Sequence, residues 1–241
     1  MRLAVVSDIH GNLTALKAVL ADLRAIGVDL VVQGGDLVAN GSRPAEVVDL
    51  IHELGWPGVC GNTDEMLWRP ELLPELESKA PSKHGLRRVL FNDIAPATRG
   101  LLGEARINWL RGLPQQWCGK DATVLHASPG NLWRAPLADA PENELVSTYG
   151  GFQSGTVIYG HIHRPFVRRL EGFTVANSRS VGLPYDGDPR ASYVVVEDGA
   201  VTIRRVEYDV DQEIQELHAK HYPHSEWLAS ILRTAQYRPP F

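Results

Sequence analysis

The sequence has little of what would tie a protein to a membrane, an oxidising compartment or nucleic acid. Its two cysteines, Cys60 and Cys118, cannot form a disulfide framework or a four-thiolate zinc site, so we expect a reducing cytosol. No apolar run reaches the length of a membrane span, and the apolar stretch before Ser7 is too short for a signal peptide. The net charge of −5 offers no basic excess for nucleic acid or anionic lipid. A cytoplasmic protein is therefore predicted.

The first third of the chain alternates apolar runs with helical patterns. Strands are predicted at Leu3–Val6 and at 30–32, and helices at 13–26 and at 44–54. A weaker strand at 58–60 would complete a βαβαβ series of the kind that builds a parallel sheet. The 241 residues suffice for one large α/β unit, and we expect a single domain over residues 1–241.

The middle and the end of the chain differ in pattern. Proline, leucine and arginine are frequent in 65–120, which predicts a helical insertion that either caps a site or forms a peripheral layer. Further elements are predicted as strands at 123–125 and 156–159, hairpins at 166–176 and 193–206, and one or two helices over 210–233. Hairpins imply antiparallel pairing, so the second half is expected to form its own sheet packed on the first.

Polar residues follow the predicted strands at the point where each one ends. They are Asp8, His10, Asp36, Asn62, His126, His161 and His163. Ligands of open α/β sheets bind outside the carboxyl ends of the strands, so these side chains are expected to meet there. Taken singly, each could be an ordinary turn residue or a hydrogen-bonded core histidine. Seven such coincidences instead predict a site for hard or borderline metal ions.

The spacing of the ligands adds detail to this prediction. Side chains alternate along an extended chain, so Asp8 and His10 should point the same way, and His161 and His163 repeat that spacing. Seven oxygen and nitrogen donors exceed what one tetrahedral zinc uses. They fit two ions about 3.5 to 4 Å apart that share a carboxylate. Asp36 is the best candidate for that shared ligand.

Five blocks of residues, in this order, resemble the calcineurin-like metallophosphoesterase superfamily. They are Asp8-x-His10, Gly35-Asp36, Gly61-Asn62-x-Asp64, His126 and Gly160-His161-x-His163. The blocks at 180–182 and 186–193 resemble its bacterial YfcE-like phosphodiesterase branch. The resemblance implies an α/β (α+β) fold, a four-layer αββα sandwich of two mixed β-sheets flanked by helices.

The resemblance also implies how two metal ions are held. One would bind Asp8, His10, Asp36 and His163, and the other Asp36, Asn62, His126 and His161. A metal-bridging hydroxide would then attack a phosphodiester or phosphomonoester, with catalytic roles for Asp36, Asn62, Asp64 and His126. Manganese is the first choice, with iron, zinc, nickel or magnesium as alternatives. The expected substrate is a phosphorylated small molecule or a nucleotide.

Two positions depart from the family pattern. Thr63 stands where many members carry a histidine thought to assist the leaving group, and threonine cannot act as an acid near pH 7. Arg179 stands where relatives usually carry glycine. We expect it to be exposed and solvated, with contact to a substrate phosphate as the alternative. Asn12 and Arg134 are better candidates for substrate binding, because each lies within a few residues of a proposed metal ligand.

The same residues favour three other functions less strongly. Ser7 and Ser128 do not lie in a G-x-S-x-G turn, so neither is expected to act as a nucleophile. A non-catalytic metallophosphoesterase-like module that binds metal or a partner protein would be expected to have lost ligands. A nuclease of the same superfamily would need a basic groove, which the acidic net charge does not favour. Nucleic acid is not expected as a substrate, and the sequence leaves a homo-oligomer open.

Overall fold

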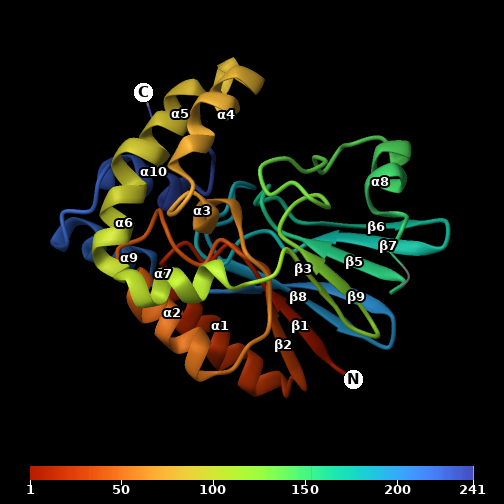
Figure 1. The fold of residues 1–241 in the computed structure, drawn as a ribbon. Coiled ribbons are helices and arrows are strands. Elements are labelled where there is room, and N and C mark those ends of the chain that lie inside the picture. Colours follow the sequence, from red (N-terminus) through yellow and green to blue (C-terminus); the bar gives the residue numbers. More distant parts are fainter. Residues whose placement is uncertain (153, 241) are drawn as a thin grey trace.

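Two mixed β-sheets form the centre of the structure, a computed structural model that describes residues 1–152 and 154–240 (Figure 1). The first sheet has the order β2-β1-β8-β9, with β1 at Leu3–Val6, β2 at Leu30–Gln33, β8 at Ala191–Glu197 and β9 at Ala200–Val206. The second has the order β3-β4-β5-β7-β6, with β3 at Gln116–Cys118, β4 at Thr123–Leu125, β5 at Thr156–Tyr159, β6 at Phe166–Leu170 and β7 at Phe173–Asn177. Each contains parallel and antiparallel neighbours.

Helices cover the outer faces of both sheets. The helices on the side of the first sheet are α1 (Leu13–Ile26), α2 (Pro44–Glu53), α6 (Ala95–Leu102), α7 (Glu104–Arg111), α9 (Val210–Ala219) and α10 (Ser225–Thr234). The second sheet is covered by α8 (Glu142–Tyr149), whose Leu145 and Tyr149 pack against β5 and β7. The predicted four-layer αββα sandwich is therefore confirmed. In the described residues, no helix is both long and apolar enough to span a membrane.

Side-chain alternation along the strands produces these layers. In β1, Ala4 and Val6 pack against the helices, whereas Leu3 and Val5 pack between the two sheets. In β5, Ile158 lies between the sheets and its neighbours face α8. Each side chain that is fully buried in this way contributes about 1.5–3 kcal/mol, which fixes the register of the central strands.

The predicted hairpin at 193–206 forms, turning at Asp198 and Gly199, but it belongs to the first sheet. Strand β8 lies antiparallel to β1, with Val194 opposite Val5. The expectation that the second half of the chain forms its own sheet is therefore wrong for this hairpin. The reason is burial: every residue of β8 except Glu197 is buried, so this strand needs a neighbour on each edge and cover on both faces.

Two other predicted elements differ from the structure. Residues 58–60 form no strand: Gly58 makes an isolated bridge to Gln33, and the Cys60 N–H then bonds to the carbonyl of Pro114 instead of continuing along β2. The end of the predicted helical insertion is also not helical. Residues 116–118 form the edge strand β3, whose partner is β4.

Most of the insertion extends the helical layer. It follows the short helix α3 (Asn62–Glu65) and contains α4 (Leu73–Lys79), α5 (His84–Arg88), a π-helix at Val89–Ile94, and then α6 and α7. Apolar residues from Val89 to Leu110 join the same core cluster as α1 and α2. Helices α4 and α5 project above that layer (Figure 1), and Leu76 is their one buried residue in the cluster. Residues 89–110 thus form a peripheral layer. A capping role for the other residues of the insertion stays a prediction, and so does the single-domain organisation of the chain.

Candidate metal centre

The loops after β1, β2 and β5 bring four buried side chains to one point. Asp8, His10, Asp36 and His163 each offer one ligand atom, and these atoms all lie within 4.8 Å of one another. They are the four residues predicted for the first metal ion. Three of them leave less than 3% of their surface exposed, and His163 leaves 4%. A charged carboxylate buried this deeply needs a compensating charge.

A second group lies on the other side of Asp36. The Asn62 Oδ1 atom is 2.9 Å from Nε2 of His126 and 2.7 Å from Nδ1 of His161. Asp36 faces both groups, because its Oδ2 is 3.7 Å from His10 Nε2 and its Oδ1 is 3.5 Å from His126 Nε2. The structure therefore brings together all seven residues that the sequence predicted as ligands.

Left-handed backbone conformations aim the ligands of both pairs. The φ angles are 56° at Asp8 and 53° at His10, and 66° at His161 and 54° at His163. The predicted extended conformation of these pairs is therefore wrong. Asp8 and His10 do share one ligand group, whereas His161 and His163 belong to different groups. The loop cannot extend because its N–H groups bond to the neighbouring loop, as in the 3.0 Å bond from Asp8 N to the carbonyl of Gly35. Such strain costs about 1–3 kcal/mol per residue and clusters at functional sites.

Two hydrogen bonds and one close backbone contact hold the carboxylate of Asp8 in place. The Ser7 hydroxyl donates to Asp8 Oδ2 at 2.6 Å, and the N–H of His161 donates to Asp8 Oδ1 at 3.0 Å. Gly160 lies directly against this carboxylate, since a Cβ atom at that position would be 2.2 Å from Asp8 Oδ2. Only glycine fits there without moving the carboxylate.

The hydrogen bonds of two histidines show that the site suits cations. His163 Nδ1 lies 2.5 Å from the Leu183 carbonyl, which can only accept, so Nδ1 carries a proton and Nε2 is the nitrogen that faces the site. Nε2 lies 3.1 Å from Asp8 Oδ1. His126 Nδ1 likewise donates to the Gly34 carbonyl at 3.0 Å. Acceptors that face acceptors repel unless a cation lies between them, and histidine ligands of metals typically donate their other N–H to a carbonyl.

The pKa values of Asp36, His10 and His161 are shifted mainly because these side chains are buried. Burial, reinforced by the charge of Asp8, raises the pKa of Asp36 to about 8. Burial and the neighbouring His163 lower the pKa of His10 to about 3. Burial and His126 also lower the pKa of His161 well below its ordinary value. His10 and His161 are thus neutral at pH 7, and a divalent cation would favour the ionised form of Asp36.

Asp64 and Thr63 support the site from behind. The Asp64 carboxylate accepts backbone N–H bonds from Leu37, Val38 and Gly61 at 3.0 to 3.3 Å, and so ties two ligand loops together. Burial and the charge of Asp36 raise its pKa to about 7. The Thr63 hydroxyl donates to the Val38 carbonyl at 3.2 Å, so it is already engaged.

The two predicted substrate-binding residues lie in different surroundings. Asn12 leaves 2% of its surface exposed and caps α1, because its Oδ1 accepts from the N–H of Ala15 at 2.9 Å. Arg134 is exposed on the loop after Trp133, whose indole N–H donates to Glu65 at 2.9 Å. A substrate contact from either residue stays a prediction.

Arg179 is not a solvated loop residue, which corrects the sequence-based expectation. Its side chain is fully buried and pairs with Asp186, and it also donates to the carbonyls of Asp188 and Arg190. The segment that it closes carries two partners of His163: Leu183, and Tyr185, whose ring stacks on the imidazole at 4.5 Å. Neither residue was predicted from the sequence, because no motif spacing marks them.

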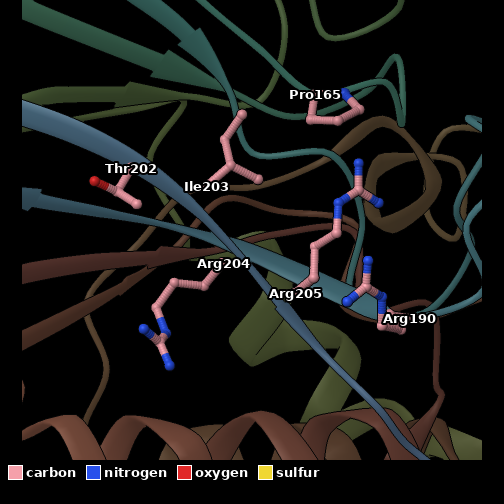
Figure 2. A pocket seen from close by; sticks show the side chains of 6 residues that line it. All are labelled: Pro165, Arg190, Thr202, Ile203, Arg204 and Arg205. Carbon is pink, nitrogen blue, oxygen red and sulfur yellow. The ribbon is translucent and has the colours of Figure 1, made fainter.

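A hollow of about 550 Å³ on β9 lies apart from this centre. Its lining residues are Pro165, Arg190, Thr202, Ile203, Arg204 and Arg205 (Figure 2). The arginines are neutralised by carboxylates, since Arg190 pairs with Asp188 at 2.6 Å and Arg205 with Asp186 at 2.7 Å. Figure 2 shows Arg204 pointing away from both. We therefore assign no anion to this hollow.

The fold and the donor set are those of a metallophosphoesterase, and the comparisons agree. The chain belongs to the calcineurin-like phosphoesterase superfamily, whose domain model matches residues 1–199. The uncharacterized protein MJ0912 of Methanocaldococcus jannaschii is 31% identical over 253 residues, which cover 95% of this chain and 96% of that protein. The family predicted from the sequence motifs is therefore confirmed.

Two solved structures match nearly the whole chain. A metallophosphoesterase from Sphaerobacter thermophilus is 28% identical, with a TM-score of 0.79 over 98% of this chain and 100% of that chain. The hypothetical protein PH1004 from Pyrococcus horikoshii is 21% identical, with a TM-score of 0.81 over 98% and 99%. The second similarity shows the fold alone.

Proposed function

We propose that this protein is a two-metal-dependent phosphoesterase that hydrolyses phosphodiester or phosphomonoester bonds. The observation that carries the proposal is the position of Asp36, whose two carboxylate oxygens face two separate groups of nitrogen and oxygen ligands. Asp8, His10 and His163 would complete one metal site. Asn62, His126 and His161 would complete the other.

Divalent ions in these sites would lower the pKa of a water molecule and polarise the phosphoryl oxygens. The chain itself supplies the positions of the ligands, the imidazole nitrogens and a buried carboxylate that faces both sites. It offers no acid at Thr63, whose hydroxyl is bonded to Val38. Esters with acidic leaving groups, which need no proton from the enzyme, should therefore be the better substrates. The donor set alone does not discriminate among manganese, iron, zinc, nickel and magnesium. Manganese is our first choice because of the family resemblance.

The test is hydrolysis of bis-p-nitrophenyl phosphate and p-nitrophenyl phosphate by protein reconstituted with manganese, with the bound metal counted. We expect turnover of at least one ester. His161→Ala should lower the hydrolytic activity by more than the roughly 10- to 100-fold that is typical when a residue that only orients a metal ligand is removed. His52→Ala is the matched control, because His52 is an exposed imidazole in α2. If the protein binds two metal ions and hydrolyses neither ester, the proposal is wrong and a non-catalytic metal- or protein-binding module takes its place.

A further inference from the structure

Two tyrosines extend outward from the metal centre. The Tyr185 ring stacks on that of His163, with centroids 4.5 Å apart and planes 21° apart. Tyr237, from the segment after α10, packs edge-on against Tyr185 with the centroids 5.5 Å apart. Tyr237 leaves 41% of its surface exposed. We call Tyr185 and Tyr237 the aromatic wall.

Backbone hydrogen bonds fix both parts of the aromatic wall. The Tyr185 N–H donates to the carbonyl of His163 at 3.2 Å, so the ring and the metal ligand are held by one loop. The segment that carries Tyr237 is bonded on each side: the Gly187 N–H donates to the Ala235 carbonyl at 2.8 Å, and the Trp227 indole donates to the Arg238 carbonyl at 2.9 Å. The wall is therefore a fixed surface.

The inner tyrosine, Tyr185, lies against the proposed ligand His163. Its hydroxyl makes no hydrogen bond within residues 1–152 and 154–240. An exposed tyrosine alone would need no explanation. Here the exposed ring continues a stack that starts on a proposed metal ligand, where a phosphoester would bind.

We propose that the aromatic wall binds a planar aromatic group of the substrate, so that the enzyme prefers phosphoesters that carry a nucleobase or an aryl group. The proposal rests on the phosphoesterase function proposed above. Aromatic rings attract each other in stacked or edge-to-face geometry at 4.5–7 Å between centroids, and the exposed part of Tyr237 offers such a surface. Stacking of a base on an aromatic side chain favours binding by roughly 5- to 150-fold.

The test compares two esters with the same leaving group, thymidine 5′-(p-nitrophenyl phosphate) and methyl p-nitrophenyl phosphate. For the manganese-loaded protein, we expect a higher kcat/KM for the thymidine ester. Tyr237→Ala should reduce the ratio of the two kcat/KM values by roughly 5- to 150-fold, mainly through KM of the thymidine ester. Tyr237→Phe, which keeps the ring, should keep the ratio. Leu101→Ala on α6 is the matched control, since Leu101 is 42% exposed and Tyr237 is 41% exposed.

A binding measurement separates this proposal from a loss of chemistry. Phosphonates are not hydrolysed, so an adenosyl-bearing phosphonate and methylphosphonate report binding alone. Calorimetry should show that the adenosyl compound binds more tightly, and Tyr237→Ala should abolish this difference in affinity. If Tyr237→Ala hydrolyses both esters with an unchanged ratio of their kcat/KM values, the aromatic wall does not bind the substrate, and the proposed phosphoesterase function is unaffected. If the wild-type protein hydrolyses neither ester with two metal ions bound, both proposals are wrong.

Discussion

Arg179 should control one metal site that it does not touch. Replacing it with methionine removes a fully buried guanidinium and leaves two carbonyl groups without their donor. Asp186 keeps a partner, because Arg205 also bonds to it at 2.7 Å. The loop closed by Arg179 carries Leu183, whose carbonyl orients His163. The substitution should therefore lower both the stability of the fold and the affinity of the metal site.

The expected size follows from the two hydrogen bonds to carbonyl groups that are lost. A hydrogen bond from a charged donor contributes about 1.5–3 kcal/mol, so the loss is about 3–6 kcal/mol, a large part of the roughly 5–15 kcal/mol by which a typical folded protein is stable. For a chain of this length, the melting temperature should fall by about 6–24 °C. Loss of a group that orients a metal-bound histidine lowers metal affinity by about 10- to 100-fold. We expect both effects for Arg179→Met.

The assay is denaturant unfolding together with a manganese titration of the folded protein. Arg190→Met is the matched control, because Arg190 pairs with Asp188 at the surface with 44% of its side chain exposed, and such a pair contributes about 0–1 kcal/mol. Arg179→Lys should recover only part of the loss, since lysine cannot bond to the carboxylate and two carbonyls in the same plane. If Arg179→Met loses stability but keeps its manganese affinity, the link through the loop to His163 is refuted.

Two further predictions concern the carboxylates of the site. Gly160→Ala should displace Asp8 and reduce kcat/KM by about 100-fold with loss of bound metal, because its Cβ would lie 2.2 Å from Asp8 Oδ2. Full metal content would contradict this, and Gly100→Ala, with open space around it, is the control. The metal-free protein should lose stability as pH rises from about 6.5 to 8.5. Folded Asp36 and Asp64 hold protons up to pKa values of about 8 and about 7, whereas the unfolded chain releases them near 3.8. Bound manganese should flatten this slope, and equal slopes in urea unfolding with and without metal would contradict the reasoning.

The sequence predicted the ligand set because six of the seven ligands follow a strand, and the carboxyl ends of those strands, from both sheets, meet at one place. Asn62 follows residues 58–60, which form no strand but lie beside the end of β2. The family motifs added the pairing of residues at each metal. Asp64 shows the limit of that route: a catalytic role was implied by resemblance, whereas the structure shows its carboxylate bonded to three backbone N–H groups. A motif records which residue is present, and the bonds that it makes depend on loops far away in the chain.

Other features depended on long-range packing and had no local signal. The placement of β8 beside β1 follows from burial on both faces, which a run of valines does not distinguish from other central strands. Helix α8 was missed because only Leu145 and Tyr149 of its eight residues are buried, too few for a clear helical period. Arg179 was expected in solvent because a loop position says nothing of the carboxylate seven residues further on.

The hydrogen bonds around Asp8 set an order on events during synthesis. Every predicted ligand lies before residue 164, yet the Asp8 loop is also bonded by Val181 and Gly182, whose N–H groups donate to the carbonyls of Ser7 and Asp8 at 3.0 Å. Strand β8 then pairs with β1 immediately before that loop. A nascent chain that already carries all seven ligands thus still lacks the contacts that hold Asp8 in its left-handed conformation. A metal ion would therefore meet Asp8 in its native geometry only once β8 has been synthesised and has paired with β1.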